Sequence, residues 1–182
     1  MGSLAAAVLL LAAAPARARA QEPHEKRLEL RIAELANVAI SGVQAGWLIG
    51  GAIVTSPRRQ ELEYSRYVDF QQGFLEASTP WAPMLMPLAL VANATALVLL
   101  WPERDEPAFW LTAAGLAFQI GVAVAAFFLN VPANTEVESW SATGTPPPDW
   151  RDVRDQWETG QLLRTIFATA AFGSNTAAAT LF

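Results

Sequence analysis

The stretch APMLMPLALVANATALVLLW, residues 82–101, contains no charged side chain and decides the fold class. A helix needs about 20 predominantly apolar residues to cross the hydrocarbon core of a bilayer, and this stretch has that length. Charges are also absent between Glu34 and Arg58, between Glu106 and Glu136, and after Arg164. The sequence therefore predicts four membrane helices, at about residues 35–55, 82–101, 108–129 and 162–182.

These four stretches predict an all-α protein, an antiparallel four-helix transmembrane bundle with residues 35–182 as one membrane domain. Charged residues make up 16% of the chain, against roughly 25% in soluble domains. A soluble helical bundle is the alternative, but its helices would need a polar face, and these have almost none. We expect a multipass protein of the cell membrane.

The N-terminus has the features of a targeting segment. Residues 1–20 contain an apolar run followed by Ala18-Arg19-Ala20, which is typical of a secretory signal and its cleavage site. The positive residues that usually precede the apolar run are absent. We favour cleavage after Ala20, with an uncleaved segment at the membrane surface as the alternative. Residues 21–34 form a polar N-terminal segment.

Composition excludes several kinds of site. The chain has no cysteine, and its single histidine is His24. Disulfides, iron–sulfur clusters and thiol redox chemistry are therefore excluded, as is a haem or copper site built on several histidines. The net charge of −5 is spread over short loops without a basic patch for nucleic acid. We expect neither a metal nor a cofactor.

Several residues in or beside the predicted spans indicate how the helices pack and where they end. Gly42, Gly46 and Gly50 share one face, which favours close packing of another helix over a ligand groove, so we expect Gly46 to be buried. Asn93 lies in the middle of the second span and needs a partner inside the bundle. Pro132 is expected to end the third span. A capping-box pattern formed by Thr135 and Glu138 then predicts a new short helix.

The first and third connections of an antiparallel bundle lie on the same side of the membrane. The third connection contains Trp140, Trp150 and Trp157. The first connection carries a largely aromatic and apolar stripe on one face of a predicted helix, formed by Tyr64, Tyr67, Val68, Gln71, Phe74 and Leu75. We therefore predict interfacial helices in both connections and one aromatic-rich membrane face.

The fourth span is expected to begin as a charged helix, because three prolines precede Asp149 and exclude an earlier start. Arg151 can pair with Asp155, and Arg154 with Glu158, at a spacing of four. One stripe of this helix faces the bundle, formed by Trp150, Val153, Trp157, Gln161 and Arg164.

Arg164 has two interpretations. Its side chain either extends to the lipid headgroups or turns inward to Asn130, Asn134 or an anionic ligand, since polar groups at membrane depth are commonly functional. The two asparagines are similarly either helix-end residues or amides that bind the polar edge of a planar molecule.

The pattern N-V-P-A-N-x5-W, followed by D-W-x3-R-x2-W-x6-R-T, resembles the anthrone oxygenase-like family of small integral membrane proteins (domain of unknown function 1772). The resemblance covers about residues 36–182. The matching residues are Asn130, Pro132, Asn134, Trp140, Asp149, Trp150, Arg154, Trp157, Arg164 and Thr165.

The resemblance implies a four-helix membrane protein. Some fungal members oxidise anthrones to anthraquinones without metal or flavin, and a basic histidine has been discussed for them. This chain has no histidine in the matched region, and the polar residue beside the last helix is Gln161. If a base is needed for proton abstraction, Glu158 or Glu138 would have to serve.

Two functions follow, and the sequence leaves open whether the protein is an enzyme. The first is a membrane protein that binds a flat apolar or lipid-like ligand at the aromatic face, with membrane lipid, a membrane protein or a second copy as partner. The alternative is a cofactor-independent monooxygenase that converts anthrone-like phenols to quinones. A proton-coupled exporter is disfavoured because no Asp or Glu lies inside a predicted span. The predicted ligand-binding residues are Asn130, Asn134, Trp140, Trp150, Arg154, Trp157, Gln161 and Arg164.

Overall fold

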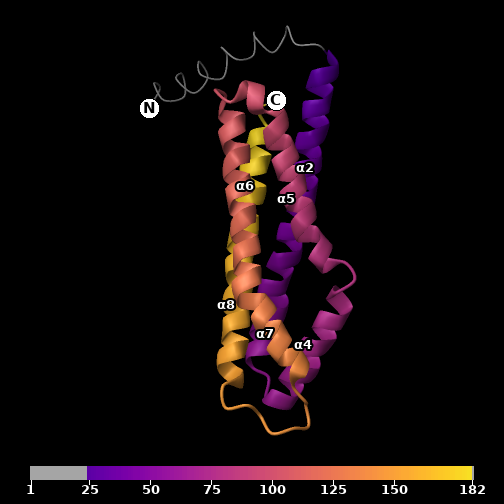
Figure 1. Cartoon of the computed structure of the whole chain (residues 1–182), viewed down its shortest axis with the longest axis vertical. Coiled ribbons are helices and arrows are strands. Elements are labelled where there is room, and N and C mark those ends of the chain that lie inside the picture. The colour runs from indigo at the N-terminus through magenta and orange to yellow at the C-terminus, as the bar shows by residue number, and fades with distance from the viewer. Residues whose placement is uncertain (1–23, 182) are drawn as a thin grey trace.

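The structure, a computed structural model, describes residues 24–181. The predicted leader lies outside this range. All regular structure within it is helical and no strand occurs, which confirms the all-α class. The long helices and their shorter companions are α2 (His24–Gly50), α4 (Tyr64–Ser78), α5 (Ala82–Leu99), α6 (Pro107–Ala125), α7 (Val131–Ser139) and α8 (Trp150–Ala179) (Figure 1). Short segments complete the chain: the π-helical turns η1 (Gly51–Thr55) and η3 (Ala126–Asn130), the one-turn helix α3 (Ser56–Gln60) and the 3-10 turn η2 (Trp101–Glu103).

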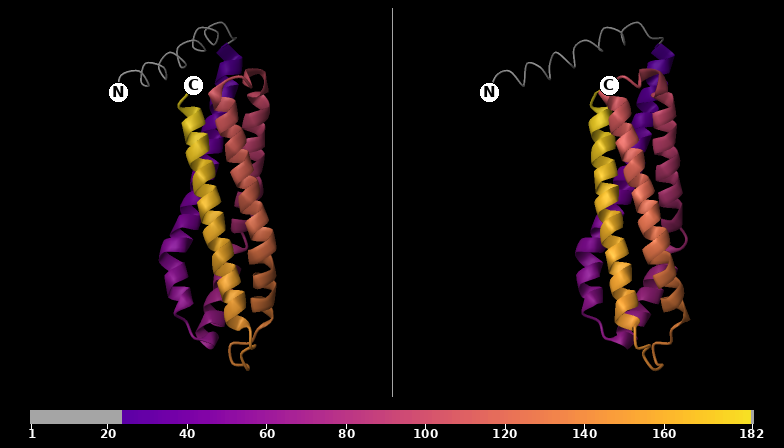
Figure 2. Two further views of the ribbon diagram at one scale, coloured as in Figure 1. Left: turned by 90° about the vertical axis from the view of Figure 1, so that its left-hand side faces the viewer. Right: turned by 60° about the vertical axis from the view of Figure 1, so that its left-hand side comes forward.

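Helices α2, α5, α6 and α8 run side by side, and α8 packs chiefly against α6 and α2 (Figures 1 and 2). The α5–α6 loop, the start of α2 and the end of α8 lie at one end of the molecule. Helices α3, α4 and α7 and the loop 140–149 lie at the other, which we call the aromatic end. The first and third connections therefore share one end of the molecule.

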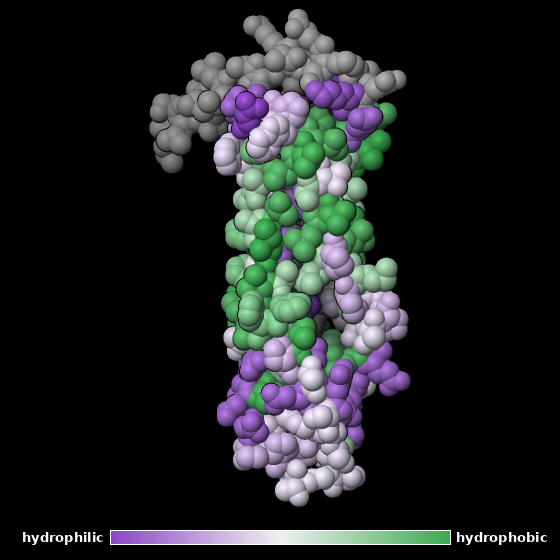
Figure 3. Space-filling view, viewed as in Figure 1, coloured by the Kyte–Doolittle hydropathy of each residue, from purple (hydrophilic) through white to green (hydrophobic). Residues whose placement is uncertain are grey.

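Three helical stretches are long and apolar enough to cross a membrane: Lys26–Gln60, Ala82–Leu99 and Pro107–Ser139. Their outward residues include Val43, Val91 and Phe128, each more than half exposed, and Figure 3 shows a hydrophobic belt between two hydrophilic ends. Among residues 24–181, α8 is not one of these stretches, and its second half carries Thr, Ser and Asn side chains. The fourth span stays a prediction.

The first helix is longer than expected. Helix α2 passes without a break through residues 24–50, so the predicted boundary between the polar segment and the first span falls inside one helix. Glu34 consequently lies within the first candidate helix, Lys26–Gln60, one residue before the predicted span, and its side chain is 2% exposed. It is therefore buried in the bundle, although the sequence placed it in the polar segment. Asn93 donates to Asn175 Oδ1 at 3.1 Å, which confirms its predicted partner inside the bundle.

Pro132 does not end the third helix, because α6 continues through η3 directly into α7. In the wide turn of η3 the Val131 N–H donates to Ala126 O. Pro132 then falls in the first turn of α7, where its missing N–H is tolerated. The hydroxyl of Thr135 donates backward to Val131 O at 3.1 Å, so no capping box forms.

The prediction that Gly46 is buried is also wrong. Gly46 is exposed, and a Cβ atom built on it would meet no other group within 4 Å. The inward stripe of α2 instead includes Ser41, Ala45 and Leu48, a spacing that turns Gly46 outward. Gly42 does allow a close approach, because its Cβ would lie 3.0 Å from the ring of Phe172.

Candidate functional site

The aromatic end is closed by α4, whose predicted stripe faces protein. Tyr64, Tyr67 and Val68 pack in one cluster with residues of α7 and α8. The Gln72 amide donates to Val137 O and Trp140 O at 2.9 Å each. Because this face is covered by protein, it does not lie against lipid as an isolated interfacial helix would.

A cavity of about 270 Å³ lies beside this cluster, where α4 and α5 face η3, α7 and α8. Figure 3 shows the surface hollowed below its middle, between the α4–α5 segment and the α6–α7 segment. Aromatic rings of Trp47, Phe74 and Trp157 contribute to its walls. Its polar lining consists of Ser78, Thr79, Asn130, Asn134, Glu138, Gln161 and Arg164. An aromatic wall with a few polar groups is the usual composition of a small-molecule site.

Two asparagines hold Trp157 in the cavity wall. The indole N–H of Trp157 donates to Asn134 Oδ1 at 2.7 Å, and the Asn130 amide donates to Trp157 O at 2.9 Å. This contact requires Gly160, because a Cβ there would lie 2.6 Å from Asn130 Oδ1. That oxygen is buried and accepts no hydrogen bond, so Asn130 retains a free acceptor.

Arg164 also lines the cavity. Its side chain is half-buried, and its Nε atom is buried without a hydrogen-bond acceptor. No carboxylate of residues 24–181 forms an ion pair with it. Of the two interpretations left open by the sequence, this position favours the inward one.

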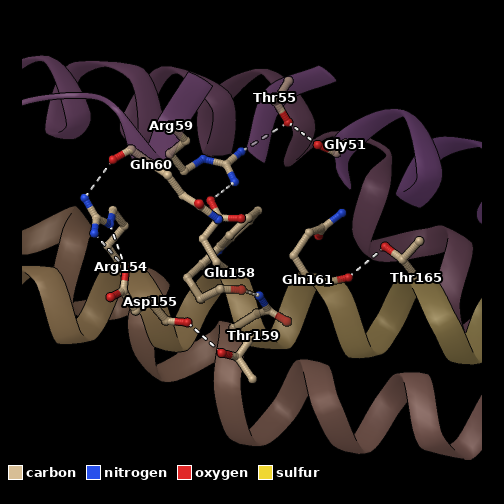
Figure 4. Close-up of polar contacts among 12 residues, drawn as sticks. Gly51, Thr55, Arg59, Gln60, Arg154, Asp155, Glu158, Thr159, Gln161 and Thr165 are labelled. Carbon is tan, nitrogen blue, oxygen red and sulfur yellow. Dashed lines mark hydrogen bonds and ion pairs between the residues drawn. The ribbon is translucent and has the colours of Figure 1, made fainter. Parts of the chain in front are cut away.

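Gln161 and Thr165 attach α8 to the end of α2. Both side chains donate to Leu48 O at 3.2 Å, a carbonyl just before the π turn η1. The Thr165 hydroxyl also donates to Gln161 O at 2.8 Å (Figure 4). Glycine leaves room for the Gln161 side chain here, since a Cβ on Gly51 would lie 2.8 Å from its amide nitrogen.

A buried ion pair supports the cavity from behind Trp157. Arg59 Nη1 contacts Glu158 Oε1 at 2.7 Å, and the two side chains are 0% and 8% exposed (Figure 4). The Arg59 guanidinium lies 4.0 Å from the centre of the Trp157 ring. Such a cation–π contact is worth about 2 kcal/mol when desolvated. Arg59 therefore fixes the ring from a second direction.

The sequence did not identify this pair. It predicted that Glu158 pairs with Arg154, which is wrong: Arg154 contacts Asp155 at 2.8 Å and donates to Gln60 O at 3.1 Å. In the sequence Arg58 and Arg59 are neighbours in what looks like a loop. In the structure they lie in the one-turn helix α3, which directs Arg59 and not Arg58 towards α8. Pro57, in the first turn of that helix, was the available signal.

Three of the eight predicted site residues lie outside the cavity. Trp140, Trp150 and Arg154 join the aromatic cluster at the aromatic end, where the Trp150 ring lies 5.6 Å from that of Tyr64. Burial in this cluster raises the pKa of Tyr67 to about 12, against the opposing effect of the nearby positive charge of Arg59. The other five residues line the cavity, and their binding of a ligand stays a prediction.

A second hollow, of about 600 Å³, lies on the other side of α8, between that helix and η1–α3. Glu158, Arg154 and Asp155 line it, and no aromatic ring does. Although it is larger, it lacks a surface for an apolar ligand, so we take the aromatic cavity as the candidate site. Within residues 24–181, no three His, Cys, Asp or Glu side chains gather into a metal-binding group.

Comparison with known proteins relates the chain to a described family. Residues 81–174, just over half of the chain, match the family model described as anthrone oxygenase. No curated protein matches the chain, and no solved structure does. The matched range includes all eight predicted site residues, whereas Trp47, Arg59 and Phe74 lie before it.

Proposed function

This chain belongs to the anthrone oxygenase family, and from that premise we propose that it binds a flat, apolar ligand with one polar edge in the aromatic cavity. One observation carries the proposal. The Arg164 Nε atom is buried without an acceptor in the same cavity wall as the fixed ring of Trp157. A ligand that stacks on the ring and accepts a hydrogen bond from Arg164 matches both groups.

The membrane context supports lateral entry of such a ligand. Three apolar helices and the family membership indicate a membrane protein, and we propose that α8 is the fourth span of an antiparallel bundle in the cell membrane. The cavity lies at the edge of the hydrophobic belt in Figure 3, so a membrane-dissolved molecule reaches it without crossing bulk water. Reporter fusions in the connections 58–76 and 141–155 should report the same side, and opposite sides would exclude this topology.

The polar groups of the cavity restrict which chemical groups the ligand can carry at its polar edge. Arg164 offers donors and a positive charge, which favour a phenolate, carboxylate or carbonyl oxygen. Asn130 Oδ1 accepts no hydrogen bond, but it lies against Gly160 and is not assigned to the ligand. A ring system with an oxygen substituent satisfies Arg164, whereas a purely hydrocarbon ligand would leave its buried Nε atom unpaired, at about 1–3 kcal/mol.

Binding can be tested with 1,8-dihydroxyanthraquinone, the full-length protein in lipid nanodiscs and equilibrium dialysis. Arg164→Met keeps the length of the side chain and removes its charge and donors. We expect it to weaken binding about tenfold or more, equivalent to about 1.4 kcal/mol. The control Arg151→Met changes an exposed arginine at the same end and should bind like the wild type. Equal affinity of all three proteins would refute the assignment.

The family membership and one further residue favour catalysis as a second function. Glu138 is a carboxylate that lines the cavity, whereas Glu158 is paired with Arg59 and lines the other hollow. In such a reaction Glu138 would take a proton from the methylene of an anthrone. The resulting carbanion reduces O2 and forms a hydroperoxide. Loss of water then leaves a carbonyl, so one oxygen atom enters the product and the other leaves as water.

Oxygen consumption with anthrone as substrate tests this second function. The wild-type protein should consume one O2 for each quinone formed, and Glu138→Gln should lose most of the activity while still binding the anthraquinone. The matched control is Glu136→Gln, which changes an exposed carboxylate of the same helix. Oxygen consumption no faster than the uncatalysed reaction would exclude catalysis and leave the binding function alone.

A further inference from the structure

A column of polar side chains occupies the bundle interior away from the aromatic cavity. On α2 and α6 the column follows spacings of three and four residues, which keep side chains on one helix face. The positions are Glu34, Asn37 and Ser41 on α2, and Thr112, Gly115 and Gln119 on α6. All of these side chains except that of glycine are at most 2% exposed. Two helices therefore present matched polar faces to each other.

Helices α5 and α8 complete this group. Thr112 donates to Glu34 Oε1 at 3.2 Å. Asn175 accepts from Asn93 at 3.1 Å and donates to Asn37 Oδ1 at 3.4 Å. Gly115 makes room for this arrangement, because a Cβ atom there would collide with Asn175 Oδ1. All four long helices thus contribute to one buried cluster of polar side chains, which we call the chamber.

Apolar layers close the chamber at both ends. One helical turn towards the α5–α6 loop, Leu30, Leu100 and Phe109 form a buried cluster. Towards the aromatic cavity, a second cluster is formed by Ala45, Leu48, Val122 and Ala168. The chamber is therefore separated both from solvent and from the candidate ligand site.

The chamber lacks positive charge and has unsatisfied acceptors. Glu34 Oε2, Asn93 Oδ1 and the amide oxygen of Gln119 are buried without a donor. The unpaired donors are fewer, namely the amide nitrogens of Asn37 and Gln119. An isolated carboxylate is too costly to bury in charged form and is either neutralised or paired.

No charged group of the described helices neutralises Glu34. Its hydrogen bond comes from Thr112, and the parts of α5, α6 and α8 at this level, residues 93–100, 109–115 and 171–178, contain no Asp, Glu, Lys or Arg. On α2 itself Arg27 and Arg31 are exposed. The α5–α6 loop adds charged residues beyond the apolar layer: Glu103, Arg104, Asp105 and Glu106.

We propose that the chamber is an occluded site for one monovalent cation, either a proton carried by Glu34 or an alkali ion held by its carboxylate and the neighbouring amide and hydroxyl oxygens. A single positive charge balances the single carboxylate. A divalent ion is a poor match, because calcium sites usually draw on several carboxylates and carbonyls and magnesium keeps most of its water. This site is independent of the ligand proposed for the aromatic cavity.

The thermal midpoint of the full-length protein in detergent tests the site, since a ligand that binds the folded state raises it. Two series are needed. The first replaces choline chloride by sodium or lithium chloride at constant ionic strength and pH 8. The second varies pH from 5 to 9 in each of the three salts. The variants are Glu34→Gln and, as control, Glu29→Gln, which changes an exposed glutamate of the same helix.

An alkali site predicts a midpoint that rises by several degrees with sodium or lithium in the wild type and in Glu29→Gln, but not in Glu34→Gln. A proton site predicts a midpoint that falls as pH rises, equally in all three salts, because the folded state would have to bury the charged carboxylate. Glu34→Gln should remove that dependence. If Glu34→Gln keeps the same salt and pH dependence as the wild type, the proposal is wrong.

Two measurements on the wild type keep the test decisive if Glu34→Gln does not fold. Radioactive sodium binding reports the alkali ion, and the infrared carbonyl stretch of a protonated carboxyl group reports the proton. Thr112→Val removes the donor to Glu34. It should shift the salt concentration or the pH at which the thermal midpoint changes, without abolishing the change. Detection of neither sodium nor a protonated carboxyl would overturn the proposal.

Discussion

Removal of the charge of Glu158 should destabilise the protein strongly, because Arg59 would remain as an unpaired buried cation. The Arg59 side chain is 0% exposed and its partner lies at 2.7 Å. Breaking such a pair from one side costs about 3–5 kcal/mol. A chain of this size loses about 2–4 °C per kcal/mol, so Glu158→Gln should lower the thermal midpoint by roughly 10 °C.

A double-mutant cycle separates the pair from its surroundings. Arg59→Met should cost less than Glu158→Gln, because Glu158 lines the second hollow and water reaches it there. The double variant Arg59→Met/Glu158→Gln buries no charge and should be more stable than Glu158→Gln alone. We expect a coupling energy of at least about 2 kcal/mol, near the upper part of the range for contacting residues.

The assay is reversible unfolding in detergent followed by far-ultraviolet circular dichroism, with the neighbouring pair Arg154–Asp155 as control. Those two side chains are 2.8 Å apart, but Asp155 is 62% exposed. Such a pair is worth about 0–1 kcal/mol, so Asp155→Asn should have little effect. If the losses of the two single variants at Arg59 and Glu158 simply add in the double variant, the argument from the buried pair is refuted.

Other consequences can be measured in the same assay. Gly42→Leu should lower the thermal midpoint, because the new side chain meets an aromatic ring of α8, whereas Gly46→Leu should not; the opposite order would mean that the Gly46 face is covered. Gly160→Ala should destabilise the protein because its Cβ would lie 2.6 Å from Asn130 Oδ1; an unchanged midpoint would show that the two helices can separate without cost. The raised pKa of Tyr67, about 12, means that the unfolded state releases the phenol proton first, near pH 10. The stability from the neutral phenol is therefore present below pH 10 and lost between pH 10 and 12, and Tyr67→Phe should flatten this decline relative to the wild type.

The sequence predicted the elements of the structure better than their contacts. Hydrophobic length depends on composition alone, so the helices around residues 82–101 and 108–129 could be found. The five cavity residues could be selected because the sequence places Asn130 and Asn134 just after the predicted third span, near the start of the fourth, where Trp157, Gln161 and Arg164 share a stripe. That argument needs only helical spacing and a short connection.

The remaining contacts depend on rotations that composition does not encode. A π turn is a local event, and no residue of Gly51–Thr55 requires one. Without it the direction of Arg59 could not be derived, and Glu158 was paired with its sequence neighbour instead. Similarly, Glu34 was assigned to a polar tail because a charge near a helix start is usually solvated. Its burial depends on the matching face of α6, which only the folded arrangement shows.

The two π turns also determine the direction in which the side chains that follow them point. Each turn carries one residue more than an α-helical turn would, and both lie where α8 presents Trp157 and Gln161. If residues 51–55 wound as a regular α-helix with the same number of residues, everything after them would rotate by about 100°, which would turn Arg59 away from Glu158. A regular α-helix over residues 126–130 would rotate Asn134 away from the indole of Trp157 in the same way. The loop 140–149 can change length without altering this phase, whereas in the two turns a residue can be lost only together with the wide turn that absorbs it.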